Sequence, residues 1–196
     1  MFLPLLLAYP LLVHLAVLWH RPWLQCAALV CAYTALFYRP LRAWRPSAWL
    51  GLALASVCAY LLVSAGDGLY ALYLPSIAIP CLVLSAFAPS LLPGRVPLIT
   101  RIADSMSGPL SPEQVRYTRA VTWVWTVTVG SMLLVTVGLL LFGSVEAWSV
   151  FANFLSYALL GALFAGEYAY RRLRFPEHTP MTFRAFLRSV TSYRPH

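Results

Sequence analysis

The chain has 196 residues, of which 61% are hydrophobic and 10% are charged, whereas a soluble domain carries about 25% charged residues. This composition excludes an ordinary soluble globule, because a protein of this size cannot bury so much apolar surface. The formal net charge of +8 comes entirely from arginine. These arginines lie in loops between apolar segments, so membrane topology explains the charge better than nucleic-acid binding does.

Six apolar segments follow one another along the chain, and their lengths suit a hydrocarbon layer of about 30 Å. The predicted spans are residues 2–19, 23–38, 47–65, 69–92, 118–142 and 147–170. The first segment lacks a basic leader and a small-residue cleavage site, so we interpret it as a retained span rather than a signal peptide. The sequence predicts an all-α, polytopic membrane protein with one transmembrane domain, residues 1–175, and a basic tail, residues 176–196.

The fourth segment contains three prolines, Pro75, Pro80 and Pro89. Proline removes a backbone donor and is tolerated in a span only where neighbours or water satisfy the freed carbonyl groups. We therefore expect a bent or broken helix in this segment.

A helix-start signal precedes the fifth span. Ser111, Pro112 and Gln114 fit the N-cap, N1 and N3 positions of a capping box. The fifth helix should therefore begin about two turns before the membrane.

The tail carries an amphipathic signal. Phe183, Phe186, Leu187 and Val190 are spaced at i, i+3, i+4 and i+7, which predicts one apolar helix face. We expect a short interfacial helix on the inner leaflet, with its arginines toward anionic head groups.

The arginines are segregated by side. Thirteen of the fourteen fall on one side of the six predicted spans, and only Arg21 falls on the other. The positive-inside rule assigns the arginine-rich side to the cytoplasm, which places both termini there.

No familiar catalytic or metal-binding pattern occurs in the sequence. The four cysteines lie inside apolar segments without a Cys-x-x-Cys pair or a histidine at zinc spacing, so we interpret them as buried thiols. Nucleophile elbows, phosphate loops and dinucleotide fingerprints are also missing from the sequence. We therefore predict neither a metal nor a cofactor.

Polar residues inside the spans are the candidates for chemistry. Glu167 is the candidate catalytic residue, because a carboxylate at membrane depth is costly. It also lies four residues before Arg171, so a helix-end ion pair is the alternative. Asn153, Tyr157 and Glu167 share one expected helix face, which would either line a cavity or hold helices together. His14, in the first span, is more typical of hydrogen-bonded packing than of a ligand or base.

Several arginines should converge at the cytoplasmic interface, among them Arg95, Arg101, Arg116, Arg119 and Arg171. Such a cluster would suit a phosphopantetheine phosphate, an acidic carrier protein or a lipid head group. Topology determination alone is the alternative interpretation.

Three stretches carry a resemblance to a known family: residues 93–103, 116–123 and 164–168. Their order and spacing resemble uncharacterised bacterial inner-membrane proteins encoded in aryl-polyene (xanthomonadin-type) pigment clusters, beside acyl carrier proteins, ketosynthases and acyltransferases. The resemblance covers about residues 70–175 and implies a bacterial inner-membrane location, with no catalytic role to carry over. The site candidates that it implies are Arg95, Thr100, Arg101, Tyr117, Arg119 and Glu167.

Three functions fit these observations. The first is an accessory membrane component that docks acyl carrier proteins or synthase subunits and hands acyl product to the membrane. The second is an integral-membrane acyl or glycosyl transferase, and the third is a small transporter of lipid or precursor. The sequence leaves the oligomeric state open, and it does not decide whether the protein is an enzyme.

Overall fold

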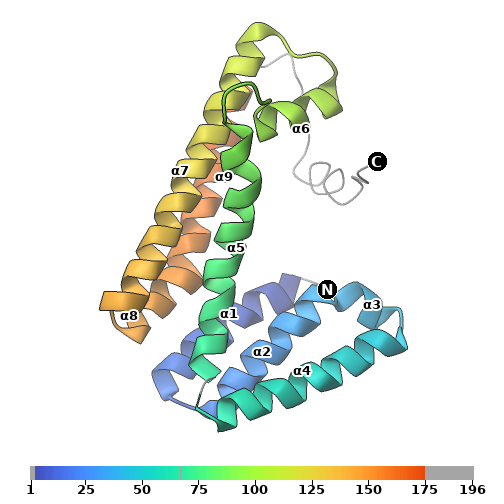
Figure 1. Ribbon diagram of the computed structural model, residues 1–196, viewed down its shortest axis with the longest axis vertical. Coiled ribbons are helices and arrows are strands. Elements are labelled where there is room, and N and C mark those ends of the chain that lie inside the picture. The colour runs from blue at the N-terminus through green and yellow to red at the C-terminus, as the bar shows by residue number, and fades with distance from the viewer. Residues whose placement is uncertain (1–2, 67, 175–196) are drawn as a thin grey trace. The chain divides into compact units, whose positions relative to one another are not determined.

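A computed structural model describes residues 3–66 and 68–174 (Figure 1). Over these ranges the chain forms helices joined by turns, without any strand. The chain divides into two units, residues 1–157 and residues 158–196. The amphipathic helix expected in the tail lies outside the described residues.

The first three apolar segments form three helices of the first unit. These are α1 (Leu3–Trp19), α2 (Pro22–Leu36) and α4 (Pro46–Ser64). Prolines begin α2 and α4, where the missing N–H would have no partner in any case. Helix α2 packs against both α1 and α4 (Figure 1). A short helix, α3 (Tyr38–Arg42), replaces the basic loop that the sequence predicted between the second and third spans.

The proline-rich segment forms one continuous helix, α5 (Gly68–Ser90). The helix is therefore not broken, and a bend at its prolines stays a prediction. Each proline removes a single donor, and Pro75 and Pro80 are separated by residues whose N–H groups are intact. The helix can therefore continue through both prolines.

The segment between the fourth and fifth spans also differs from its prediction. It contains an additional helix, α6 (Leu98–Ser107), which precedes the long α7 (Pro112–Phe142). The capping box at the start of α7 is confirmed. The Ser111 N–H donates to Gln114 Oε1 at 2.8 Å, and the Gln114 N–H donates to Ser111 Oγ at 3.3 Å.

The sixth apolar segment is helical but irregular. It begins as α8 (Val145–Val150), continues as the π-helical turn η1 (Phe151–Leu155) and ends as α9 (Ser156–Arg174). The side chain of Ser144 caps its start by accepting from the Ala147 N–H at 3.2 Å. A π turn inserts an extra residue into the helical ladder and is frequent at functional sites.

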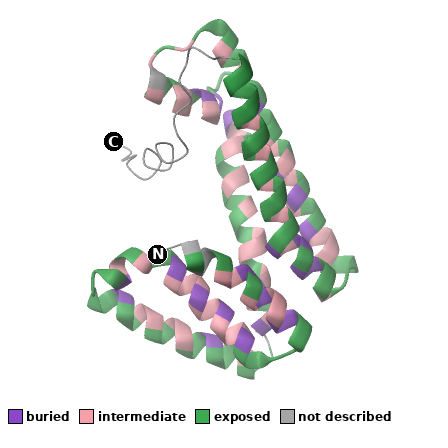
Figure 2. Cartoon of the chain, turned by 180° about the vertical axis from the view of Figure 1, so that it is seen from behind, coloured by how far each residue is buried: buried purple, intermediate pink, exposed green. Residues whose placement is uncertain are grey.

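Four helical segments of the described chain are long and apolar enough to cross a membrane: 46–64, 68–90, 112–142 and 145–174. Helices α1 and α2 are apolar but shorter. Only 6% of the most apolar stretch of α5 is buried within the protein, and exposed residues follow most of each long helix (Figure 2). Apolar surface of this extent calls for lipid as its solvent.

The buried core of the first unit lies where α1, α2, α5 and α8 meet. Its fully packed residues are Val13, Val17, Ala28, Leu72 and Trp148. The Trp148 indole N–H donates to Ser76 Oγ of α5 at 3.2 Å, so the largest side chain in this core also satisfies its polar group.

Candidate functional site

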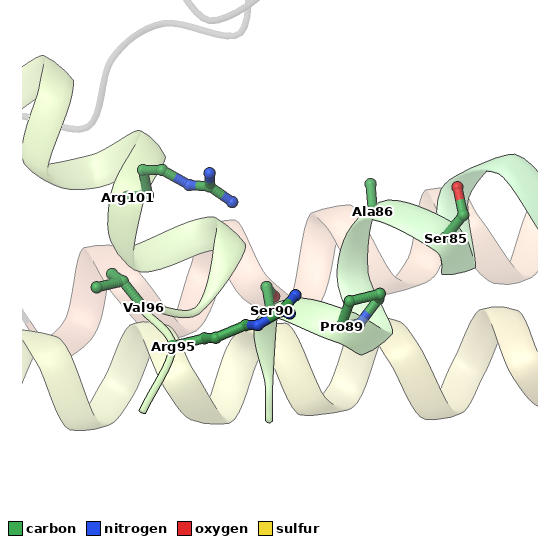
Figure 3. A pocket seen from close by; sticks show the side chains of 7 residues that line it. All are labelled: Ser85, Ala86, Pro89, Ser90, Arg95, Val96 and Arg101. Carbon is green, nitrogen blue, oxygen red and sulfur yellow. The ribbon is translucent and has the colours of Figure 1, made fainter. Parts of the chain in front are cut away.

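A cavity of about 490 Å³ lies where α5 ends and α6 begins (Figure 3). We call it the α5–α6 pocket. Its volume falls within the range of about 300–1,000 Å³ that is usual for small-ligand sites. The lining residues are Ser85, Ala86, Pro89, Ser90, Arg95, Val96 and Arg101.

Ser90 joins the two helices that form the pocket. Its hydroxyl donates to the Phe87 carbonyl at 2.7 Å and accepts from the Leu98 N–H at 3.0 Å. The first N–H of α6 therefore has a partner on α5, although a helix cannot satisfy its own first amides. Gly94, with a φ of +79°, provides the tight turn between these helices.

Threonines of α7 hold α6 from the other side. The Ile99 N–H donates to Thr122 Oγ1 at 3.3 Å, and the hydroxyls of Thr100 and Thr118 lie 2.8 Å apart. Thr100, a predicted binding residue, is buried in this contact. The structure therefore gives Thr100 a role in positioning α6, and it does not line the pocket.

Two predicted binding residues, Arg95 and Arg101, line the pocket. Arg101 extends from α6 toward α5, and Arg95 extends from the connecting turn toward Ser90 (Figure 3). Both are exposed. Within residues 3–66 and 68–174, neither arginine forms a salt bridge with a carboxylate. Their guanidinium groups are therefore available to an anion, for which each offers five N–H donors.

The other arginines of this region belong to the first turns of α7. Arg116 and Arg119 are exposed and lie one helical turn apart, while Thr118 between them faces α6. Because successive residues of a helix are turned by about 100°, Arg116 and Arg119 lie on other faces of α7 than Thr118. These arginines, together with the half-buried Tyr117, share the end of α7 that α6 contacts but do not line the pocket.

Glu167 is paired within its own helix. Its carboxylate accepts from Arg171 Nη2 at 2.6 Å, four residues further along α9. The helix-end ion pair that was the alternative for Glu167 is thus present. No group of three or more metal-ligating side chains gathers anywhere in the described part of the chain.

A second polar site lies among α1, α8 and the π turn. His14 Nδ1 lies 3.1 Å from Ser149 Oγ, and Asn153 Nδ2 donates to the Ser149 carbonyl at 3.0 Å and to Ser149 Oγ at 3.3 Å. We call His14, Ser149 and Asn153 the interior polar network. His14 is hydrogen-bonded inside the helical bundle, as expected.

The polar stripe expected in the sixth span does not form one uniform face. The π turn contains Asn153 and changes the angular spacing that a regular helix would give it with Tyr157. Asn153 is buried, whereas Tyr157 is exposed.

Comparisons with known proteins add no relative. No protein-family model, curated protein or solved structure matches this chain. The resemblance to the aryl-polyene cluster proteins therefore stays a prediction.

Sequence reasoning missed two residues that build these sites. Ser90 carries no motif, and its only signal is its position at the end of an apolar segment. Ser149 lies four residues before Asn153 in the sixth span, and this spacing on one helix face was its only signal.

Proposed function

We propose that this chain is an accessory membrane component of a polyketide- or aryl-polyene-like lipid biosynthesis pathway in a bacterial inner membrane. In this role it docks acyl carrier proteins at its basic end and hands acyl product to the membrane. Six spans with both termini in the cytoplasm are part of the proposal, since that arrangement puts thirteen of the fourteen arginines on the cytoplasmic side.

The two short helices are compatible with six spans. Helices α1 and α2 have 17 and 15 residues, which correspond to roughly 25 Å and 22 Å at about 1.5 Å per residue. A helix shorter than the hydrocarbon layer is accommodated by local thinning and by flanking residues that reach the interface. Arg21, directly before α2, supplies such a residue.

The observation that carries the docking role is the set of unpaired arginines at the α5–α6–α7 end. Arg95, Arg101, Arg116 and Arg119 are exposed, and none of them forms a salt bridge within the described residues. A basic surface attracts an acidic partner from a distance and fixes its orientation on contact. An acidic acyl carrier protein fits this surface, and the adjoining membrane would receive its product.

Binding of the purified full chain in detergent to the holo acyl carrier protein of the pathway tests this role. We expect Arg116→Gln/Arg119→Gln to weaken binding about tenfold, a change worth about 1.4 kcal/mol. Arg39→Gln/Arg42→Gln removes the same charge from α3 and is the matched control. Absence of carrier binding to the unmodified chain would contradict the docking role.

Lipid extracts of a deletion strain test the pathway itself. We expect one acyl or polyene intermediate to accumulate and to disappear when the gene is restored. An unchanged lipid profile, measured by mass spectrometry, would remove the pathway from the proposal.

A precursor transporter is the second candidate, and the interior polar network supports it. His14, Ser149 and Asn153 place polar atoms inside a helical bundle beside a π turn, and polar groups within membranes often mark a transport path. A transporter predicts that His14→Ala traps precursor on the cytoplasmic side of spheroplasts. Normal appearance of product at the outer face would argue against transport.

A further inference from the structure

The α5–α6 pocket combines cationic and apolar chemistry. Arg95 and Arg101 provide guanidinium groups, whereas Ala86, Pro89 and Val96 provide carbon surface (Figure 3). The planar fork of arginine matches the oxygen geometry of phosphate and binds it through paired N–H donors. Two guanidinium groups suit a terminal phosphate, which presents three oxygens and close to two negative charges.

The two serines of the pocket use their hydroxyl protons within α5. Ser85 donates its hydroxyl proton to Leu82 O at 2.7 Å, and Ser90 donates to Phe87 O at the same distance. Neither hydroxyl proton is directed at a ligand. The guanidinium groups are therefore the donors that determine which head group can bind.

An apolar face of α5 continues from the pocket along the helix. Ile79, Leu82, Ala86 and Pro89 follow one another at helical spacings of three and four residues, so they share one helix face. Ile79 is 60% exposed and Leu82 is 72% exposed. The acyl chain of a lipid can lie on such a face while the head group of the lipid binds Arg95 and Arg101.

We infer that the α5–α6 pocket binds the phosphate head group of a membrane lipid whose chain lies along the Ile79–Pro89 face of α5. The inference rests on the proposed function and deepens it, because it names the class of lipid that takes part at this end of the protein. The phosphate is a terminal one, as in phosphatidic acid. A phosphodiester beside a choline group carries less charge and brings a cation toward the arginines.

Native mass spectrometry of the full chain in detergent tests this inference with three probes: phosphatidic acid, phosphatidylcholine and inorganic phosphate. We expect phosphatidic acid to bind at least about tenfold more tightly than phosphatidylcholine, as two charge-assisted contacts would give. We also expect inorganic phosphate not to displace it at equal concentration. Displacement at equal concentration would assign the pocket to free phosphate and overturn the lipid inference.

Paired variants locate the site. Arg95→Gln/Arg101→Gln should lower phosphatidic acid affinity about tenfold, while the control Arg39→Gln/Arg42→Gln should leave it unchanged. Equal losses in both double variants would show diffuse charge attraction and overturn the inference.

Two further variants distinguish a loss of head-group binding from an effect on folding and from a loss of contact with the acyl chain of the lipid. Arg95→Lys/Arg101→Lys keeps the positive charge that topology needs but loses the planar forks, so we expect it to insert normally and bind several-fold more weakly. Leu82→Gln should weaken the binding of phosphatidic acid and leave the binding of inorganic phosphate unchanged. Full phosphatidic acid affinity in both variants would overturn the inference.

The lipid and carrier measurements are independent of each other. Phosphatidic acid selectivity without carrier binding would keep the lipid site and remove the docking role. Carrier binding without any lipid selectivity would keep the docking role and overturn the lipid site.

Discussion

The imidazole Nδ1 of His14 in α1 lies 3.1 Å from the hydroxyl oxygen of Ser149 in α8. Asn153 Nδ2 donates to the same oxygen, so one hydroxyl oxygen joins the side chains of His14 and Asn153. This contact connects residues 135 positions apart and ties the first helix to the last apolar segment.

Removing the Ser149 hydroxyl should destabilise the helical bundle. Ser149 is fully buried, so Ser149→Ala leaves His14 Nδ1 without this partner. We expect a loss of about 0.6 kcal/mol, the average for hydrogen bonds between membrane helices, and at most about 1.7 kcal/mol. Unfolding by sodium dodecyl sulfate measures the effect. Ser64→Ala, at an exposed serine that bonds only to its own helix, is the control, and equal stability of the two variants would contradict the prediction.

The contact between α6 and α7 should be weakened by a single hydroxyl-to-methyl change. Thr122→Val removes the acceptor of the Ile99 N–H at nearly constant volume. We expect faster hydrogen–deuterium exchange across residues 98–107 and little change in global stability, because only one local bond is lost. The control is Thr126→Val, since Thr126 bonds only to a carbonyl of its own helix. Unchanged exchange in Thr122→Val would show that this bond does not hold α6.

Gly108 should resist substitution because of its backbone conformation. Its φ of 76° and ψ of −167° lie in a region that is essentially restricted to glycine. We expect Gly108→Ala to cost about 1–3 kcal/mol, the usual strain of such conformations. Gly138→Ala, inside α7 with open space around the added carbon, should be neutral or slightly stabilising. Thermal unfolding in detergent compares the two, and equal melting temperatures would refute the strain argument.

The start of α7 should depend on its capping box. Ser111→Ala removes the oxygen that accepts from the Gln114 N–H, and the loss of such a cap costs about 1 kcal/mol. We expect faster hydrogen exchange in the first turns of α7, which carry Arg116. Ser105→Ala, at an exposed serine bonded to Ile102 O, is the control. Identical exchange in both variants would mean that the cap is not formed.

Glu167→Gln distinguishes an ion pair from a catalytic carboxylate. Arg171 is 44% exposed and Glu167 is 16% exposed in this pair, and an ion pair one turn apart on a helix contributes only about 0.2–0.5 kcal/mol. We expect normal insertion and an unchanged amount of product in lipid extracts measured by mass spectrometry. Loss of product from a normally inserted variant would favour the integral-membrane transferase.

Features that depend on neighbouring residues were predictable, and those that depend on distant contacts were not. The Ser111 cap is local, and α5 ends at Ser90, within two residues of the predicted boundary. Helix α6 was missed although Ile99, Ile102 and Met106 have amphipathic spacing, because it lies in a loop between spans and is held by Ser90 and Thr122. The π turn at Asn153 has no sequence signature, so the sequence pattern placed Asn153 and Tyr157 on one face of a regular helix. The pocket joins Ser85 and Arg101, which only the folded turn brings together.

The two amides at the start of α6 have partners that are synthesised at different times. The partner of the Leu98 N–H, Ser90, leaves the ribosome before α6, whereas the partner of the Ile99 N–H, Thr122, is added 23 residues later. Both hydrogen bonds can be present only once the first turns of α7 have been made and lie against α6. The complete capping of α6 therefore requires α5 and α7 to have come together around it.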